Sequence, residues 1–138
     1  MTNGNQSPLV ATRGLRVRFS CAHLYHQTSW DSAKNQAVFG KCFSEHGHGH
    51  DYELWIETTE LDSFAKLKTA AANLREQLDH QHLNFAIPEF STQVPTTENL
   101  VLYCSNFLKT QMGEPNLQLE LTLFECPWLG AQTTEGVS

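Results

Sequence analysis

The chain has 138 residues, of which 40% are apolar and 10% aromatic, enough for the packed core of a single domain. Its formal net charge of −6 argues against a nucleic-acid-binding surface, and no apolar stretch approaches the ~20 residues of a membrane span. Residues 1–8 are polar and lack the pattern of a signal peptide, so we expect a soluble cytoplasmic protein with neither nucleic acid nor membrane as a partner.

The first predicted strand runs from Leu15 to His23, where Leu15, Val17 and Phe19 alternate with polar residues. Residues 24–41 lack a clean period and predict a long loop with room for a short helix. Residues 1–44 contain five basic residues and one acidic residue, an excess that fits either an anionic substrate or strand-edge arginines in water.

Three histidines alternate with glycines in the most informative segment, which reads Cys42-Phe43-Ser44-Glu45-His46-Gly47-His48-Gly49-His50-Asp51-Tyr52. If the segment enters the strand predicted over 52–58, His48 and His50 point to the same face, with Cα atoms about 7 Å apart. Neutral imidazole is a common ligand of Zn²⁺, and a catalytic zinc has three protein ligands and one open position. His23, at the end of the first strand, would complete the set.

Three alternatives to this metal site stay open. The segment also fits a glycine-rich surface turn that binds no metal. A closed structural zinc could use Cys42 as a thiolate beside three histidines, in which case it stabilises the fold rather than catalysing a reaction. The metal pair could also be His46 and His48, although the start of the following strand favours His48 and His50.

Two helices and one more strand are predicted in the rest of the chain. Apolar residues recur at three- and four-residue steps from Phe64 to Leu78, and Asp62 or Ser63 can cap this helix. A second helix begins near Pro95 and ends before Gly113. Residues 117–124 alternate as a strand, and no strand is predicted after Glu125. One domain is therefore expected over 9–130, with loose termini at 1–8 and 131–138.

This order of elements predicts an α+β fold, an antiparallel sheet with two helices on one face. The opposite sheet face is polar, so either water covers it or several subunits close it into a barrel.

Other polar residues fit acid–base chemistry or substrate binding. Asp79 and His80 form a carboxylate–imidazole pair, which is also typical of a histidine at a helix C-terminus. Glu125 can accept two parallel N–H bonds from a guanidine-like edge. Thr97 and Glu98 fit either a binding turn or the capped first turn of a helix.

Cys42 can act as a base if a nearby metal or histidine lowers the pKa of its thiol. The four cysteines could pair as disulfides, but a cytoplasmic chain favours free thiols. Cys21, Cys104 and Cys126 sit in apolar patterns and are expected to be inert.

Six motifs in register resemble the 6-pyruvoyltetrahydropterin synthase family, which includes 6-carboxytetrahydropterin synthase. They extend from about Leu15 to Glu125 and comprise Phe19-Ser20-Cys21-Ala22-His23, Phe39-Gly40-Lys41-Cys42, Gly47-His48-Gly49-His50-Asp51-Tyr52, Leu78-Asp79-His80-Gln81-His82-Leu83-Asn84, Pro95-Thr96-Thr97-Glu98-Asn99-Leu100 and Glu125. The resemblance implies a tunnelling fold, in which three subunits close a barrel and two trimers stack into a homohexamer with sites at the subunit interfaces.

The resemblance also implies an activity, the zinc-dependent conversion of 7,8-dihydroneopterin triphosphate to 6-pyruvoyl- or 6-carboxy-tetrahydropterin with triphosphate release. It implies Zn²⁺ on His23, His48 and His50. It implies Cys42 as the proton-abstracting base with Asp79 and His80 as its relay partners, and a pterin held by Glu125 with help from Thr97 and Glu98. The alternative is a non-catalytic module on the same fold, which binds zinc and pterin or has a structural role.

Overall fold

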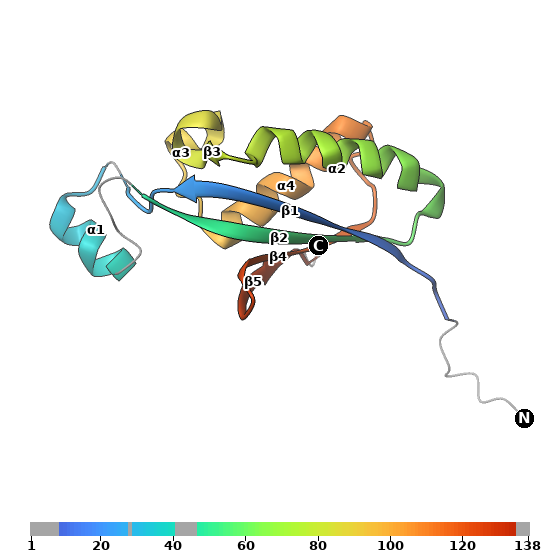
Figure 1. The fold of residues 1–138 in the computed structure, drawn as a ribbon, viewed down its shortest axis with the longest axis horizontal. Coiled ribbons are helices and arrows are strands. Elements are labelled where there is room, and N and C mark those ends of the chain that lie inside the picture. The colour runs from blue at the N-terminus through green and yellow to red at the C-terminus, as the bar shows by residue number, and fades with distance from the viewer. Residues whose placement is uncertain (1–8, 28, 41–46, 135–138) are drawn as a thin grey trace, which may run out of the picture.

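The computed structural model describes residues 9–27, 29–40 and 47–134, which form a five-stranded sheet with helices packed on one face (Figure 1). The spatial order of the strands is β3-β1-β2-β4-β5. Their bounds are β1 (Arg13–His23), β2 (His48–Thr58), β3 (Gln81–His82), β4 (Leu119–Cys126) and β5 (Leu129–Gln132). No helix in this described part of the chain is long and apolar enough to cross a membrane.

The sheet is mixed rather than wholly antiparallel. The pairs β1–β2, β2–β4 and β4–β5 are antiparallel, as predicted, whereas β3 pairs parallel with the end of β1. The prediction of an antiparallel sheet is therefore wrong for this short strand. The reason is that α2 (Phe64–Leu78) runs in the same direction as β1, and β3 continues from its end (Figure 1).

Two long helices, α2 and α4 (Thr97–Met112), pack on one sheet face, which confirms the predicted layer. The Thr96 hydroxyl caps α4 by accepting from the Asn99 backbone N–H at 3.1 Å, and Gly113 ends the helix with φ of 66°. Ser63 occupies the N-cap position of α2, but its side chain makes no capping hydrogen bond.

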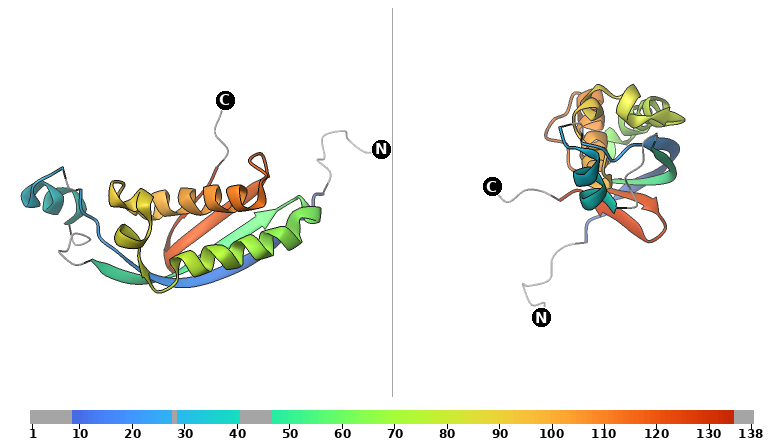
Figure 2. Two further views of the ribbon diagram at one scale, coloured as in Figure 1. Left: turned by 90° about the horizontal axis from the view of Figure 1, so that it is seen from above. Right: turned by 90° about the vertical axis from the view of Figure 1, so that its left-hand side faces the viewer.

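Shorter helices lie at one end of the sheet. The predicted loop after β1 contains α1 (Ser32–Phe39), which stands beyond the sheet and apart from α2 and α4 (Figure 2). Asp31 caps it by accepting from the Lys34 backbone N–H at 2.7 Å. The sequence did not predict α3 (Leu83–Ala86) or the 3₁₀ turns at Leu61–Ser63 and Pro88–Ser91.

The chain continues into β5 after a turn at residues 127–128, so the expectation of no strand after Glu125 is wrong. The sheet extends past residue 130, because the Thr133 backbone N–H donates to the Leu121 carbonyl at 2.9 Å. Gly130 allows this hairpin, since a Cβ there would lie 2.6 Å from the Leu123 carbonyl oxygen. β5 is short and lacks β-branched residues, which is why its sequence signal is weak.

The core lies between the sheet and the two long helices. Alternate residues of each strand face the helices, and each buried leucine or valine side chain contributes roughly 1.5–3 kcal/mol. The core side chains include Val17, Phe19, Leu54, Ile56, Leu121 and Leu123 from the strands and Leu67, Leu74, Leu78, Leu100, Val101 and Leu108 from the helices. At the end of the sheet next to α1, the strand positions that face the helices are occupied by polar side chains instead of apolar ones.

Candidate metal centre and active site

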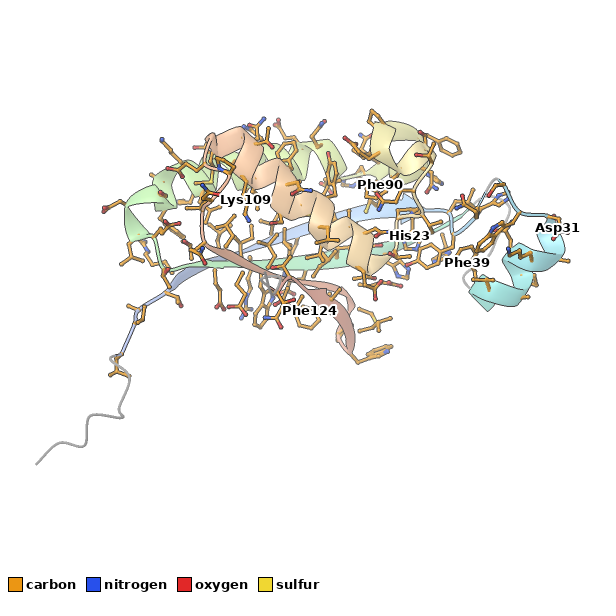
Figure 3. All side chains as sticks on the ribbon, turned by 180° about the vertical axis from the view of Figure 1, so that it is seen from behind. His23, Asp31, Phe39, Phe90, Lys109 and Phe124 are labelled. Atoms are coloured by element: carbon orange, nitrogen blue, oxygen red, sulfur yellow. The ribbon has the colours of Figure 1, made fainter. Side chains whose placement is uncertain are left out.

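Three histidines converge where the end of β1 pairs with the start of β2, on the sheet face that carries the helices. His23 is the last residue of β1 and pairs with His48, the first residue of β2, while His50 follows two residues later on the same face. The Nε2 atoms of His23 and His48 lie 3.0 Å apart. One potential ligand atom from each of the three residues lies within 4.8 Å of the other two. Figure 3 shows His23 at the end of the sheet near α1.

A glycine allows this close approach. Gly47 precedes β2 with φ of 86°, a backbone conformation that residues with a Cβ rarely adopt. A Cβ at this position would also collide with the His23 carbonyl oxygen. The glycine before His48 therefore lets the start of β2 come close to the end of β1.

Burial lowers the pKa of two of the three histidines. His23 is fully buried, and desolvation together with the neighbouring His48 and His50 lowers its pKa to about 3. Desolvation and His50 also lower the pKa of His48, against a smaller opposite effect of Glu125. Neutral imidazoles present lone pairs, which is the form that binds a metal.

The environment of the His50 Nε2 atom also indicates a metal ligand. This nitrogen is buried and has no hydrogen bond among the described residues, although the Glu125 Oε1 atom lies 2.9 Å away. A distance that short without hydrogen-bond geometry means that the ring nitrogen is not directed at the carboxylate. Three converging imidazoles, one of them with a buried ring nitrogen that has no hydrogen bond among the described residues, fit a divalent metal ion.

Two tyrosines hold the buried His23 ring. The Tyr52 Oη atom lies 2.9 Å from His23 Nδ1, and the centroids of the Tyr25 and His23 rings lie 4.5 Å apart. Burial raises the pKa of Tyr52 far above its usual value, so the phenol keeps its proton. Neither tyrosine was predicted from the sequence to be a site residue. The signal for Tyr52 was present, because strand alternation puts it on the face of His48 and His50.

Glu125 links this centre to the start of α4. It lies near the end of β4 with its side chain 11% exposed, and its Oε2 atom accepts a hydrogen bond from the Thr97 hydroxyl at 2.6 Å. Glu125 thus lies beside His50, and Thr97, a second predicted substrate-binding residue, contacts Glu125. The third, Glu98, is exposed in the first turn of α4.

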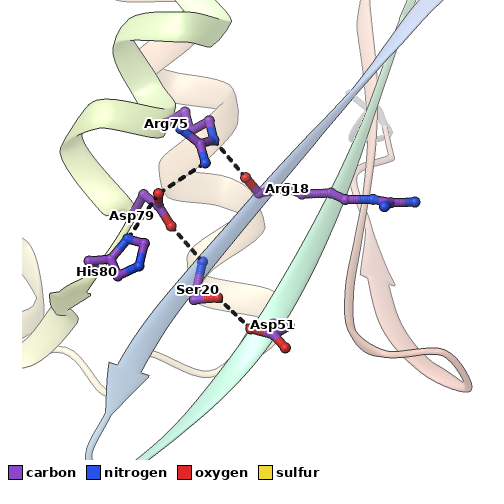
Figure 4. Close-up of polar contacts among 6 residues, drawn as sticks. All are labelled: Arg18, Ser20, Asp51, Arg75, Asp79 and His80. Atoms are coloured by element: carbon purple, nitrogen blue, oxygen red, sulfur yellow. Dashed lines mark hydrogen bonds and ion pairs between the residues drawn. The ribbon is translucent and has the colours of Figure 1, made fainter.

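Asp79 and His80 lie beside the outer edge of β1, at the end of α2 (Figure 4). Asp79 Oδ1 accepts from the Ser20 backbone N–H at 2.8 Å, while its Oδ2 lies 3.0 Å from both Arg75 Nη2 and His80 Nδ1. The pKa of Asp79 is lowered mainly by the hydrogen bond from Ser20 and to a smaller extent by His80 and Arg75. This carboxylate is therefore ionised, and it orients the His80 ring.

The same segment also forms hydrogen bonds with backbone carbonyl groups along the outer edge of β1. The Ser20 carbonyl accepts from the His80 backbone N–H at 2.6 Å, and the Arg18 carbonyl accepts from Arg75 Nε at 2.8 Å. His80 has φ of 60°, and its side chain is 82% exposed. The Ser20 hydroxyl in turn donates to Asp51. A hollow of about 380 Å³ beside this edge is lined by His80 and by residues of β1 and β2 that include His50.

The family model described as 6-pyruvoyl tetrahydropterin synthase matches residues 14–135. The chain belongs to this family.

Alignments with known 6-pyruvoyl tetrahydropterin synthases cover most of the chain. A 6-pyruvoyl tetrahydrobiopterin synthase of Drosophila melanogaster is 33% identical over 132 residues, 89% of this chain and 78% of the relative. The Homo sapiens protein of the same name is 30% identical over 111 residues, 74% of this chain and 77% of the relative. The structure of Caenorhabditis elegans 6-pyruvoyl tetrahydropterin synthase superimposes with a TM-score of 0.84 at 28% identity, covering 93% and 97% of the two chains.

The synthase family resemblance gives the role of base to Cys42, which lies outside the described residues, as does His46. Three other cysteines are free thiols. Cys21 and Cys104 are buried, and desolvation raises the pKa of Cys21 to about 12 and that of Cys104 in the same direction. These two thiols stay protonated near neutral pH, as expected of inert core residues.

Proposed function

We propose that the chain converts 7,8-dihydroneopterin triphosphate into a 6-substituted tetrahydropterin, either 6-pyruvoyl- or 6-carboxy-tetrahydropterin, with Zn²⁺ and with release of triphosphate. The observation that carries the proposal is the convergence of three histidines beside the Glu125 carboxylate, in a chain that belongs to this synthase family. The names of the curated relatives favour the pyruvoyl product.

His23, His48 and His50 would hold the metal. When bound, Zn²⁺ polarises the oxygens of the substrate side chain and acidifies the neighbouring C–H group. The contribution of the protein is to present deprotonated nitrogens, because burial lowers the pKa of His23 and of His48. Three protein ligands leave one position for the substrate.

Glu125 would bind the pterin through its guanidine-like edge. A carboxylate accepts two parallel N–H bonds from such an edge, which fixes both position and orientation. The Thr97 hydroxyl holds one carboxylate oxygen at 2.6 Å, so the side chain is already oriented. We assign the neighbouring Glu98, in the same helical turn, a supporting role in binding.

Cys42, Asp79 and His80 would move the protons. The Cys42 thiolate removes a carbon-bound proton, and His80, oriented by Asp79 at 3.0 Å, exchanges protons with the substrate oxygens or the thiol. Elimination of triphosphate leaves an enol that becomes one ketone. Oxidation of the second carbinol carbon is balanced by reduction of the dihydropterin ring, so the pyruvoyl reaction needs no external oxidant. For the carboxy product, water adds to the carbonyl carbon next to the ring and the adjoining C–C bond breaks, which releases the two-carbon fragment as acetaldehyde.

Identification of the products tests this proposal. The zinc-loaded protein is incubated with 7,8-dihydroneopterin triphosphate, and the pterins and triphosphate are identified by mass spectrometry and ion chromatography. We expect stoichiometric triphosphate and a 6-pyruvoyl product, while a 6-carboxy product would assign the chain to the other branch. A protein that binds zinc and pterin but forms neither product would instead be the non-catalytic module.

We also propose a cytoplasmic homohexamer of two stacked trimers with sites at the subunit interfaces. Supporting this assembly, β1 and β5 lie at or next to the two sheet edges, where β1 is paired only at Cys21 and Ala22 on its outer side within the described chain. Unpaired edges favour pairing with another chain, and the exposed Trp128 and Leu129 lie next to one of them. Light scattering after gel filtration at micromolar concentration with zinc should give about six times the 15.6 kDa chain mass, and a monomer would contradict it.

A further inference from the structure

The buried hydroxyl of Tyr52 makes a contact that core packing does not require. Tyr52 is 1% exposed, and its ring stacks on Phe19 with centroids 5.3 Å apart. A phenylalanine would fill the same space and make the same stack. A buried hydroxyl is unfavourable unless it has a hydrogen-bonding partner, and the partner here is His23 Nδ1 at 2.9 Å.

The position of this hydroxyl determines which nitrogen of His23 can bind a metal. Neutral imidazole has one N–H and one lone pair, and the hydrogen bond at one nitrogen sets which atom carries the proton. His23 Nε2 faces His48 Nε2 at 3.0 Å, so it is the nitrogen on the side of the cluster. If Nδ1 carries the proton and donates it to Tyr52 Oη, Nε2 keeps its lone pair for the metal.

We propose that Tyr52 is a positioning residue that holds His23 in the Nδ1–H tautomer and so directs the Nε2 lone pair into the metal centre. This inference rests on the metal site of the proposed function. Residues that hydrogen-bond to metal-ligating histidines fix ring orientation and raise ligand basicity, and their loss typically weakens metal affinity about 10–100-fold.

The test compares two tyrosine-to-phenylalanine variants of the full chain. Tyr52→Phe removes only the hydroxyl at the His23 ring. Tyr103→Phe is the matched control, because Tyr103 lies on α4 and packs on Phe90 and Phe107. Zinc affinity is measured by competition with a chromophoric chelator. Thermal unfolding of the metal-free proteins in a chelating buffer gives the stability independently of zinc.

We expect Tyr52→Phe to bind Zn²⁺ about 10–100-fold more weakly than the wild type, and Tyr103→Phe to bind it equally well. A purely structural hydroxyl would lower the unfolding temperature of the metal-free protein but leave the zinc affinity of the folded protein unchanged, and that result would overturn the inference. Wild-type protein that binds no zinc would refute the proposed metal site and this inference together.

Nitrogen-15 NMR of the zinc-loaded protein gives a second readout. In the wild type, His23 should show a slowly exchanging Nδ1–H proton and a metal-bound Nε2. In Tyr52→Phe the Nδ1–H proton should exchange faster, because its acceptor is gone. A protonated Nε2 on His23 in the zinc-loaded wild type would contradict the assigned tautomer even if the affinities differed.

Discussion

Replacement of His48 by alanine should remove the tightly bound zinc and lower kcat/KM about 10³-fold. The size of the effect follows from metal catalysis, where polarisation of a substrate oxygen is worth several kcal/mol and each 1.36 kcal/mol is a factor of ten in rate. His48 is the best of the three histidines for this experiment. His23 is fully buried and supports the core, and His50 also contacts Glu125. Metal content is measured by mass spectrometry and turnover by triphosphate release.

His26→Ala is the control for this variant, since it removes an imidazole that lies outside the cluster. The control should keep one zinc per chain and wild-type turnover. Chelation of wild-type protein should abolish turnover and added Zn²⁺ should restore it, whereas added Zn²⁺ should not restore His48→Ala. A His48→Ala protein that keeps both its zinc and its activity would show that the metal lies elsewhere.

Local periodicity accounts for the parts of this fold that the sequence predicted. Alternation along β1 and the three- and four-residue steps of α2 each depend on one segment, so they can be seen without the rest of the chain. The placement of His48 and His50 on one face follows from the same strand rule. Their meeting with His23 required the register of β1 against β2, which the sequence could suggest only by the position of each histidine at a strand end.

Long-range contacts explain the parts that the sequence did not predict. The Asp79 carboxylate bonds the Ser20 backbone, 59 residues away, and no local pattern indicates that a residue after a helix completes a strand edge. The parallel pairing of β3 depends on the direction in which α2 crosses the sheet. Likewise, the contact between Tyr52 and His23 joins two strands, so the hydroxyl has an evident role only once their register is known.

Replacement of Cys42 by alanine should lower kcat about 10²–10⁴-fold, the usual contribution of a general base. The zinc content should stay at one ion per chain if the three histidines alone hold the metal. This combination separates the base from the alternative in which the Cys42 thiolate is a fourth zinc ligand. A closed zinc site would lose metal affinity and stability when the thiolate is removed, because the energy of such a site is folding energy.

Cys126→Ala is the matched control for Cys42→Ala. Cys126 is a half-buried free thiol at the end of β4, where the pairing with β5 becomes irregular, and it is not one of the clustered residues. It should keep wild-type turnover. The two buried thiols cannot replace Cys42, because desolvation holds the pKa of Cys21 at about 12 and raises that of Cys104. Cys42→Ala protein with wild-type kcat would therefore exclude a thiolate base, and the Asp79–His80 pair would become the proton acceptor to test.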